Sequence, residues 1–247
     1  MSISNDIERE GIRHVGRAVA AALAAMRRHV KHGVTTRELD AIGDAALATH
    51  GARSAPREMY RFPAGSCISV NDEIVHGIPG DRVIAAGDVV KLDVTAVCEG
   101  YVADAAETVL VDPVPARVRR LAGCARLAFD DAFAVVRAGV KVNAIGRAVE
   151  SRTRAEGFAV VRELCGHGVG RAIHEQPEVP NHYQRWQQDV LSDGLVITIE
   201  PILSARATHP IPRRDGWTLA TANGSLAVHH EHTLIVSNSG AEIVTRL

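Results

Sequence analysis

The chain has few of the features that would place a protein in a class at once. Its 247 residues include only four cysteines, widely spaced and without a C-x-x-C pair, so no disulfide framework is indicated. Neither sign of charge dominates, since 28 Lys and Arg stand against 29 Asp and Glu. The net charge of −1 gives no electrostatic reason to expect nucleic acid or a membrane surface as a partner.

Long hydrophobic runs are also absent. The longest, Ala18 to Met26, has nine residues, whereas a membrane span needs about 20. Acidic residues (Asp6, Glu8, Glu10) lie where a secretory signal peptide requires a basic segment. We therefore expect a cytoplasmic protein with reduced thiols and no membrane association.

What is present is typical of a globular protein, with 46% apolar and 23% charged residues. No low-complexity tract divides the chain, which predicts a single domain over residues 1–247. Apolar residues at helical spacing predict four helices, over 5–30, 35–51, 115–136 and 143–157. Residues rich in β-branched types predict strands over 89–97, 101–111, 195–199 and 229–236.

A weak internal repeat suggests that the domain has two related halves. Residues 30–51 resemble residues 136–157 at an offset of 106, and Gly87 to Asp93 resembles Gly194 to Glu200 at an offset of 107. The similarity could be a coincidence among common glycine and apolar positions. We favour two α+β halves related by a pseudo-twofold axis, with Asp93 and Glu200 as equivalent acids beside one cleft.

Two acids are expected on one face of a hairpin. If Glu99 and Gly100 form its turn, Thr95 pairs with Asp104, and alternation places Asp93 on the same face as both. Two carboxylates so close repel each other unless a cation lies between them. The alternative is that one or both are solvated acids of an edge strand.

Further donors follow along the chain. His167 lies between glycines, which allow the backbone to approach a crowded site closely, and His174 follows seven residues later. Glu200 ends an apolar strand, and Glu231 lies within another, where an unpaired carboxylate is costly to bury. Alternation places His229 on the Glu231 side and its neighbours on the other side, but we do not expect His229 to touch a metal.

Five of these residues form a consistent metal-binding set. The four carboxylates carry a charge of −4, which two divalent cations would balance, and they are joined by one imidazole. Oxygen-rich ligation of this kind suits Mn, Co, Fe or five-coordinate Zn. Two such ions activate water and polarise a carbonyl, which favours hydrolysis of an amide or ester. The predicted ligands are Asp93, Asp104, His167, Glu200 and Glu231.

The sequence resembles the type I methionine aminopeptidases over nearly its whole length. The motifs that carry the resemblance occur in the family's order and spacing. They are Ser69–Pro79, Leu92–Thr95, Asp104, Gly166–Gly170, Ile173–Glu175, Thr198–Pro201 and Glu231–Thr233. The resemblance implies a pita-bread α+β fold, with two pseudo-symmetric halves around a dinuclear centre of Co, Mn, Fe, Zn or Ni.

The resemblance also implies a role for each site residue. Asp93 and Glu231 would bridge the metals, and a bridging hydroxide would attack the carbonyl of an N-terminal methionine. His76 and His174 would contact the substrate and stabilise the tetrahedral intermediate, and Glu200 would relay protons. The methionine side chain would lie in a pocket whose predicted residues are Phe62, Cys67, Trp217, Met59 and Ile173.

The implied activity is removal of initiator methionine from nascent proteins with a small second residue, by a monomer in transient contact with the ribosome. Only 26 residues separate His174 from Glu200, which indicates a minimal bacterial-type enzyme. Pro56, Met59 and Ile173 replace residues usual in the family, and Tyr60 falls where a histidine is common. We therefore expect a reshaped pocket that discriminates less strongly among side chains. The alternatives are another aminopeptidase of the superfamily, acting on X-Pro bonds, and a non-catalytic binding module.

Overall fold

The computed structural model of the chain describes residues 1–246. It confirms the four predicted helices and adds a short one, α3, which the sequence did not predict. The helices are α1 (Asp6–His29), α2 (Thr36–Thr49), α3 (Ala55–Tyr60), α4 (Ala116–Phe133) and α5 (Asn143–Ala155). None of these helices is long and apolar enough to cross a bilayer. The four cysteines are free thiols.

Local signals explain where the helices begin. At α2 the Thr35 hydroxyl accepts the backbone N–H of Glu38, and the Glu38 carboxylate accepts the N–H of Thr35. At α1 the Asn5 side chain accepts the N–H of Glu8. The Glu8 carboxylate, however, turns to the N–H of Ser4, so the predicted reciprocal pair is only half formed.

Most strands belong to one nine-stranded sheet. Its order is β1-β4-β5-β14-β9-β7-β8, with β2 added to β4 and β15 added to β14. Two three-stranded sheets, β13-β10-β6 and β11-β12-β3, complete the structure. The strands are β1 (Arg53–Ser54), β2 (Cys67–Val70), β3 (Glu73–Val75), β4 (Val89–Cys98), β5 (Tyr101–Leu110), β6 (Ala159–Val160), β7 (Cys165–Gly168), β8 (Glu175–Pro180), β9 (Val196–Ile199), β10 (Ile202–Ser204), β11 (Pro210–Pro212), β12 (Leu219–Thr221), β13 (Ala227–His229), β14 (Glu231–Ser237) and β15 (Gly240–Ile243).

The predicted hairpin register is confirmed. Cys98 pairs with Tyr101, Thr95 with Asp104, and Asp93 with Ala106. The single strand predicted over 229–236 is wrong in one respect, because it is broken at His230. The part up to His229 pairs with β10, whereas β14 pairs with β5 and β9, so the chain changes sheets at this residue.

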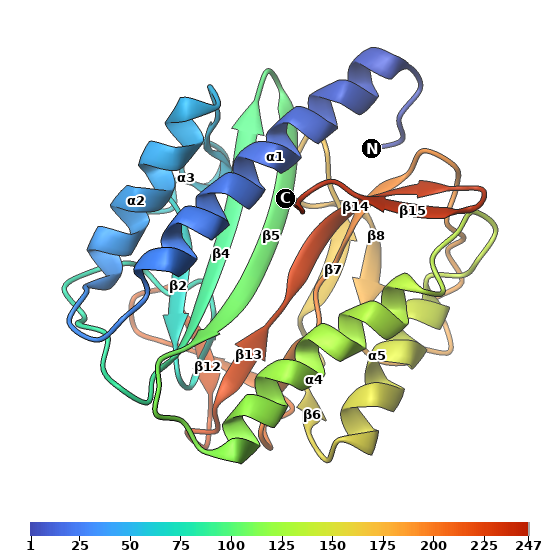
Figure 1. Cartoon of the computed structure of the whole chain (residues 1–247). Helices are drawn as coiled ribbons and strands as arrows, with labels where there is room; N and C mark the ends of the chain where they lie inside the picture. Colours follow the sequence, from blue (N-terminus) through green and yellow to red (C-terminus); the bar gives the residue numbers. More distant parts are fainter. Residues whose placement is uncertain (247) are drawn as a thin grey trace.

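Helices cover the outer face of the large sheet in two pairs, α1 with α2 and α4 with α5 (Figure 1). Helix α1 packs on β4 and β5, and a first apolar core lies beneath it. A second core lies beneath α4 and α5. The halves meet where β5 pairs with β14. Each half thus supplies two helices and a group of antiparallel strands, as the internal repeat predicts.

Candidate metal centre

The five predicted ligands come from five strands that are consecutive neighbours in the large sheet. Asp93 lies on β4, Asp104 on β5, Glu231 on β14 and His167 on β7, and Glu200 directly follows β9. Ala106 of β5 pairs with Asp93 on one side and with Glu231 on the other. Residues in such a row share one face of the sheet. The strand order therefore brings together residues that are up to 138 positions apart in the sequence.

Two groups of donor atoms lie close enough to hold a cation. In the first, Asp104, His167 and Glu231 each offer one donor atom within 4.8 Å of the others. His167 Nε2 is 4.0 Å from Asp104 Oδ2. In the second, Glu200, His229 and Glu231 meet the same condition. Glu231 is common to both groups, and Asp93 belongs to neither.

Burial gives the acids of the cluster unusual protonation behaviour. Burial, with the neighbouring charge of Glu231, raises the pKa of Glu200 to about 8. Burial also raises the pKa of Asp93 to about 7 and that of Asp104 well above its ordinary value. Several carboxylates this close cannot all ionise without a compensating charge. The cluster is therefore short of positive charge.

The unpaired atoms of the cluster test whether a cation would fit. Asp104 Oδ1 and Glu231 Oε1 are buried, and neither has a hydrogen-bond partner among residues 1–246. Buried polar atoms of this kind are costly unless something binds them. Oxygen donors with one or two imidazoles suit a divalent cation of the Mn, Co, Fe or Zn type. The residues thus fit the divalent metal that their types predict.

His229 belongs to the cluster, although the sequence did not predict it as a participant. Its Nε2 lies 3.2 Å from Glu200 Oε2 and 3.4 Å from Glu231 Oε2. Burial alone would lower the pKa of His229, but the two carboxylates outweigh it and raise this pKa to about 10. The same imidazole lowers the pKa of Glu231, against the effect of burial. Alternation along the strand was the available signal, since it placed His229 on the Glu231 side.

The two predicted substrate-contacting histidines lie at the edge of this cluster. The His174 ring centroid is 4.4 Å from that of His167. Desolvation, with the nearby His167 and His76, lowers the pKa of His174 to about 4, so its imidazole is neutral. The Tyr60 hydroxyl lies 2.8 Å from His174 Nδ1, and the two rings stack. Tyr60 therefore orients His174, a contact that sequence reasoning missed.

Three of the predicted pocket residues lie together in the structure. Phe62 and Cys67 form a small apolar cluster with Trp217 packed against it, and the rings of Phe62 and Trp217 meet edge to face at 5.2 Å. Cys67 pairs with Asp93 across β2 and β4, which sets this cluster beside the acids. Met59, in contrast, is exposed, and Ile173 is buried in the larger core beneath α1.

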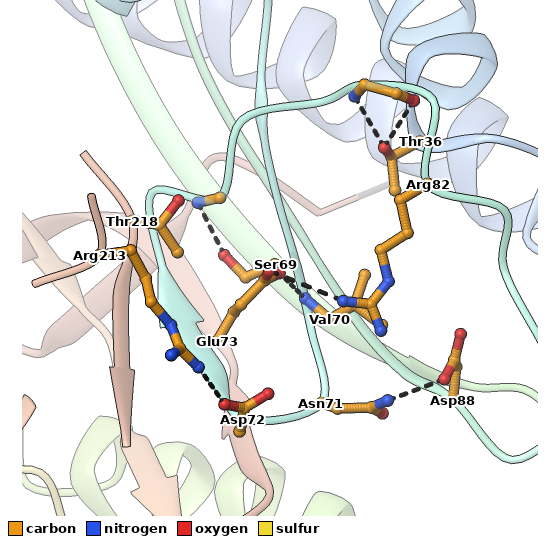
Figure 2. A network of polar contacts seen from close by, with 12 residues as sticks. Thr36, Ser69, Val70, Asn71, Asp72, Glu73, Arg82, Asp88, Arg213 and Thr218 are labelled. Atoms are coloured by element: carbon orange, nitrogen blue, oxygen red, sulfur yellow. Dashed lines mark hydrogen bonds and ion pairs between the residues drawn. The ribbon is translucent and has the colours of Figure 1, made fainter. Parts of the chain in front are cut away.

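A polar network holds the loop that carries His76 (Figure 2). The Gly77 N–H donates to Ser69 Oγ at 3.0 Å, and Arg82 pairs with Glu73 at 3.7 Å. Beneath the turn, the buried Lys91 amine donates to the backbone oxygen of Asn71 at 2.9 Å. His76 itself has a positive φ of 58°, a strained conformation for a non-glycine residue. Its neighbours on both sides therefore keep His76 in place.

The comparisons with known proteins agree with this geometry. Residues 10–238 match the metallopeptidase family M24. The chain belongs to this family. This M24 chain is 39% identical to methionine aminopeptidase 2 of Bacillus subtilis (strain 168), and the alignment covers all of both chains. It is 36% identical to the methionine aminopeptidase of Escherichia coli (strain K12), covering 99% of this chain and 94% of that one.

Solved structures confirm the pita-bread fold of this M24 chain. The crystal structure of methionine aminopeptidase from Thermotoga maritima superposes with a TM-score of 0.97 at 32% identity, over the full length of both chains. Prolidase from Pyrococcus furiosus superposes with a TM-score of 0.80 at 23% identity, covering 99% of this chain and 65% of that one. The second comparison shows a shared fold alone.

Proposed function

We propose that the chain is a metal-dependent aminopeptidase that removes methionine from the N-terminus of nascent proteins with a small second residue. The observation that carries this proposal is the convergence of five donors on five neighbouring strands. It is supported by full-length relatives that are named methionine aminopeptidases. The chain acts in this proposal as one catalytic domain, a cytoplasmic monomer in transient contact with the ribosome.

Asp93, Asp104, His167, Glu200 and Glu231 would together hold the divalent metal, with Asp93 placed beside the two donor groups by its pairing with Ala106. Such ions, when bound, lower the pKa of water and polarise a carbonyl. The chain's own part is to place acceptors and donors around the scissile bond. Glu200, which is buried within the cluster, would carry a proton to the leaving amine. The His229 imidazole, 3.2 Å from Glu200 Oε2, would help to keep this carboxylate in place.

His76 and His174 would bind the carbonyl region of the substrate. The neutral imidazole of His174 can donate a hydrogen bond to developing negative charge. The contact with Tyr60 limits the rotation of that ring. Phe62, Cys67 and Trp217 would receive the methionine side chain, because a thioether packs well against aromatic rings. Met59 is exposed and Ile173 lies in the larger core. We expect the pocket to discriminate only weakly between methionine and leucine.

Peptide hydrolysis with a matched set of substrates and variants tests the proposal. The metal-free protein is titrated with Mn²⁺, Co²⁺, Fe²⁺, Zn²⁺ or Ni²⁺ and assayed on Met-Ala-Ser, Leu-Ala-Ser and Ala-Pro-Ala. We expect cleavage of Met-Ala-Ser only with metal, and no cleavage of Ala-Pro-Ala.

In the same assay Asp104→Asn should lose activity, while Glu163→Gln, which changes an exposed acid outside the cluster, should not. A faster rate on Ala-Pro-Ala would favour X-Pro cleavage. No hydrolysis with any of the ions would favour a binding module.

A further inference from the structure

A groove lies between α1 and α4. Of its lining residues only His229 also belongs to the acidic cluster, and the others take no part in the proposed function. It has a volume of about 550 Å³, and α1, α4, β5 and β14 all contribute to its lining. Figure 1 shows α1 and α4 on the same side of the sheet, with β5 and β14 between them. The two apolar cores lie on either side of it, one beneath each helix. On this side of the sheet, no helix of residues 1–246 covers the line where β5 and β14 join the two halves.

The groove is lined by basic residues. Apart from histidines, its ionisable side chains are four arginines and one glutamate. Arg27 pairs with that glutamate, Glu107, at 3.5 Å, and Arg119 pairs with Asp112 at the rim. Within the described part of the chain, the guanidinium groups of Arg126 of α4 and Arg246 have no carboxylate partner.

Two further imidazoles and several small residues complete the lining. His230, between β13 and β14, and His232 of β14 line the groove, with their rings against Phe129 of α4 at 5.3 and 5.1 Å. The His232 ring is held by Thr245 Oγ1 at 2.9 Å from its Nδ1. Small residues form the helix walls, among them Ala20 and Ala24 of α1, and Ala122 and Gly123 of α4.

We propose that this groove binds a phosphorylated small molecule of nucleotide size, with Arg126 and Arg246 holding its phosphates. A guanidinium fork matches the oxygens of a phosphate, and two forks suit a ligand with more than one negative charge. The volume lies within the range of small-molecule sites, about 300–1,000 Å³. The small residues of the helix walls leave room for the flat, apolar part of such a ligand.

A substitution at Gly123 can fill the groove without changing its charge. A Cβ added there meets nothing within 4 Å, so a larger side chain at this helical position would project into open space. We expect Gly123→Leu to fill part of the groove, and Gly123→Ala to leave it open. Gly123 does not belong to the proposed catalytic machinery. Leucine and alanine both have a higher helix propensity than glycine.

Calorimetric titration of the metal-loaded protein with ADP and with inorganic pyrophosphate tests the proposal. The protein is first freed of excess metal, and its metal content is measured again afterwards to exclude stripping by the probe. We expect ADP to bind with a dissociation constant below about 1 mM at moderate salt. Pyrophosphate should bind more weakly, since it lacks the part that contacts the helix walls.

Two matched pairs of substitutions locate the bound ligand. The double variant Arg126→Gln/Arg246→Gln should weaken ADP binding about tenfold or more, because charge-assisted hydrogen bonds are lost. Arg117→Gln/Arg120→Gln removes the same charge from α4 on the side facing Phe158, and should change binding less than about twofold. Gly123→Leu should weaken binding, and Gly123→Ala should not.

Three results would overturn the assignment. One is the absence of ADP binding at millimolar concentration. Another is equal weakening by both arginine pairs, which would indicate general charge attraction. The last is undiminished binding in the Arg126→Gln/Arg246→Gln and Gly123→Leu variants, which would place ADP elsewhere, for instance on the metal ions. Because binding is measured directly, these outcomes do not depend on whether the protein cleaves methionine peptides.

Discussion

Metal binding to the acidic cluster should stabilise the folded protein, by an amount that reveals how many ions bind. The cluster concentrates carboxylates whose pKa values are raised because they are buried together. A cation that binds only the folded state adds RT ln(1 + [M]/Kd) to its stability, about 1.4 kcal/mol for each tenfold rise in free metal above Kd.

The expected shift follows from the size of the chain. For 247 residues the entropy of unfolding is about 0.5 kcal/mol per degree, at about 2.1 cal/mol/K per residue. Each tenfold increase in free metal should therefore raise Tm by about 3 °C if one ion binds, and by about 5 °C if two bind. Thermal unfolding of the chelator-treated protein, followed by circular dichroism over three decades of buffered free Mn²⁺, measures this slope.

Substitutions show how much each donor group contributes to the dependence of Tm on free metal. Glu231 belongs to both groups, so Glu231→Gln should abolish most of the dependence of Tm on metal. Asp104→Asn affects only the first group and should leave about half of the dependence expected for two ions. Glu163→Gln is the control, because Glu163 is exposed and lies outside the cluster. A Tm that does not respond to metal, or an unchanged slope in Glu231→Gln, would refute the reasoning.

Three other predictions concern stability and reactivity. Phe129→Ala should lower the free energy of unfolding by about 3–5 kcal/mol in urea titrations, since this ring is buried between α4 and β14; a loss below about 1 kcal/mol would show that the site collapses freely. Thr35→Ala removes the capping hydroxyl of α2 and should cost about 1 kcal/mol in the same assay, while Thr35→Ser should restore most of it. Burial raises the pKa of Cys124 to about 11 and that of Cys165 to about 12, so native protein at pH 8 should react slowly with a thiol reagent, and unfolded protein should titrate four thiols. Rapid reaction of the folded protein would contradict the burial of these side chains.

Much of the candidate site followed from sequence because its geometry is local. The register of the β4–β5 hairpin depends on a two-residue turn, and strict alternation then places Asp93 and Asp104 on one face. Helix periodicity and the repeat of about 106 residues likewise predicted two matching halves. The other ligands were predicted as donors in glycine-rich or apolar strand segments, and the strand order places all five on neighbouring strands.

Other features of the site could be seen only in the folded tertiary structure. Whether His229 contacts Glu200 depends on how β13 pairs with β10, and the contact of Tyr60 with His174 joins residues 114 positions apart. The exposure of Met59 and the basic groove between α1 and α4 depend equally on how distant elements pack. Within one strand or hairpin, backbone hydrogen bonds determine which side chains are neighbours. Between elements, only the packing of the two halves determines these distances, and no short stretch of sequence encodes it.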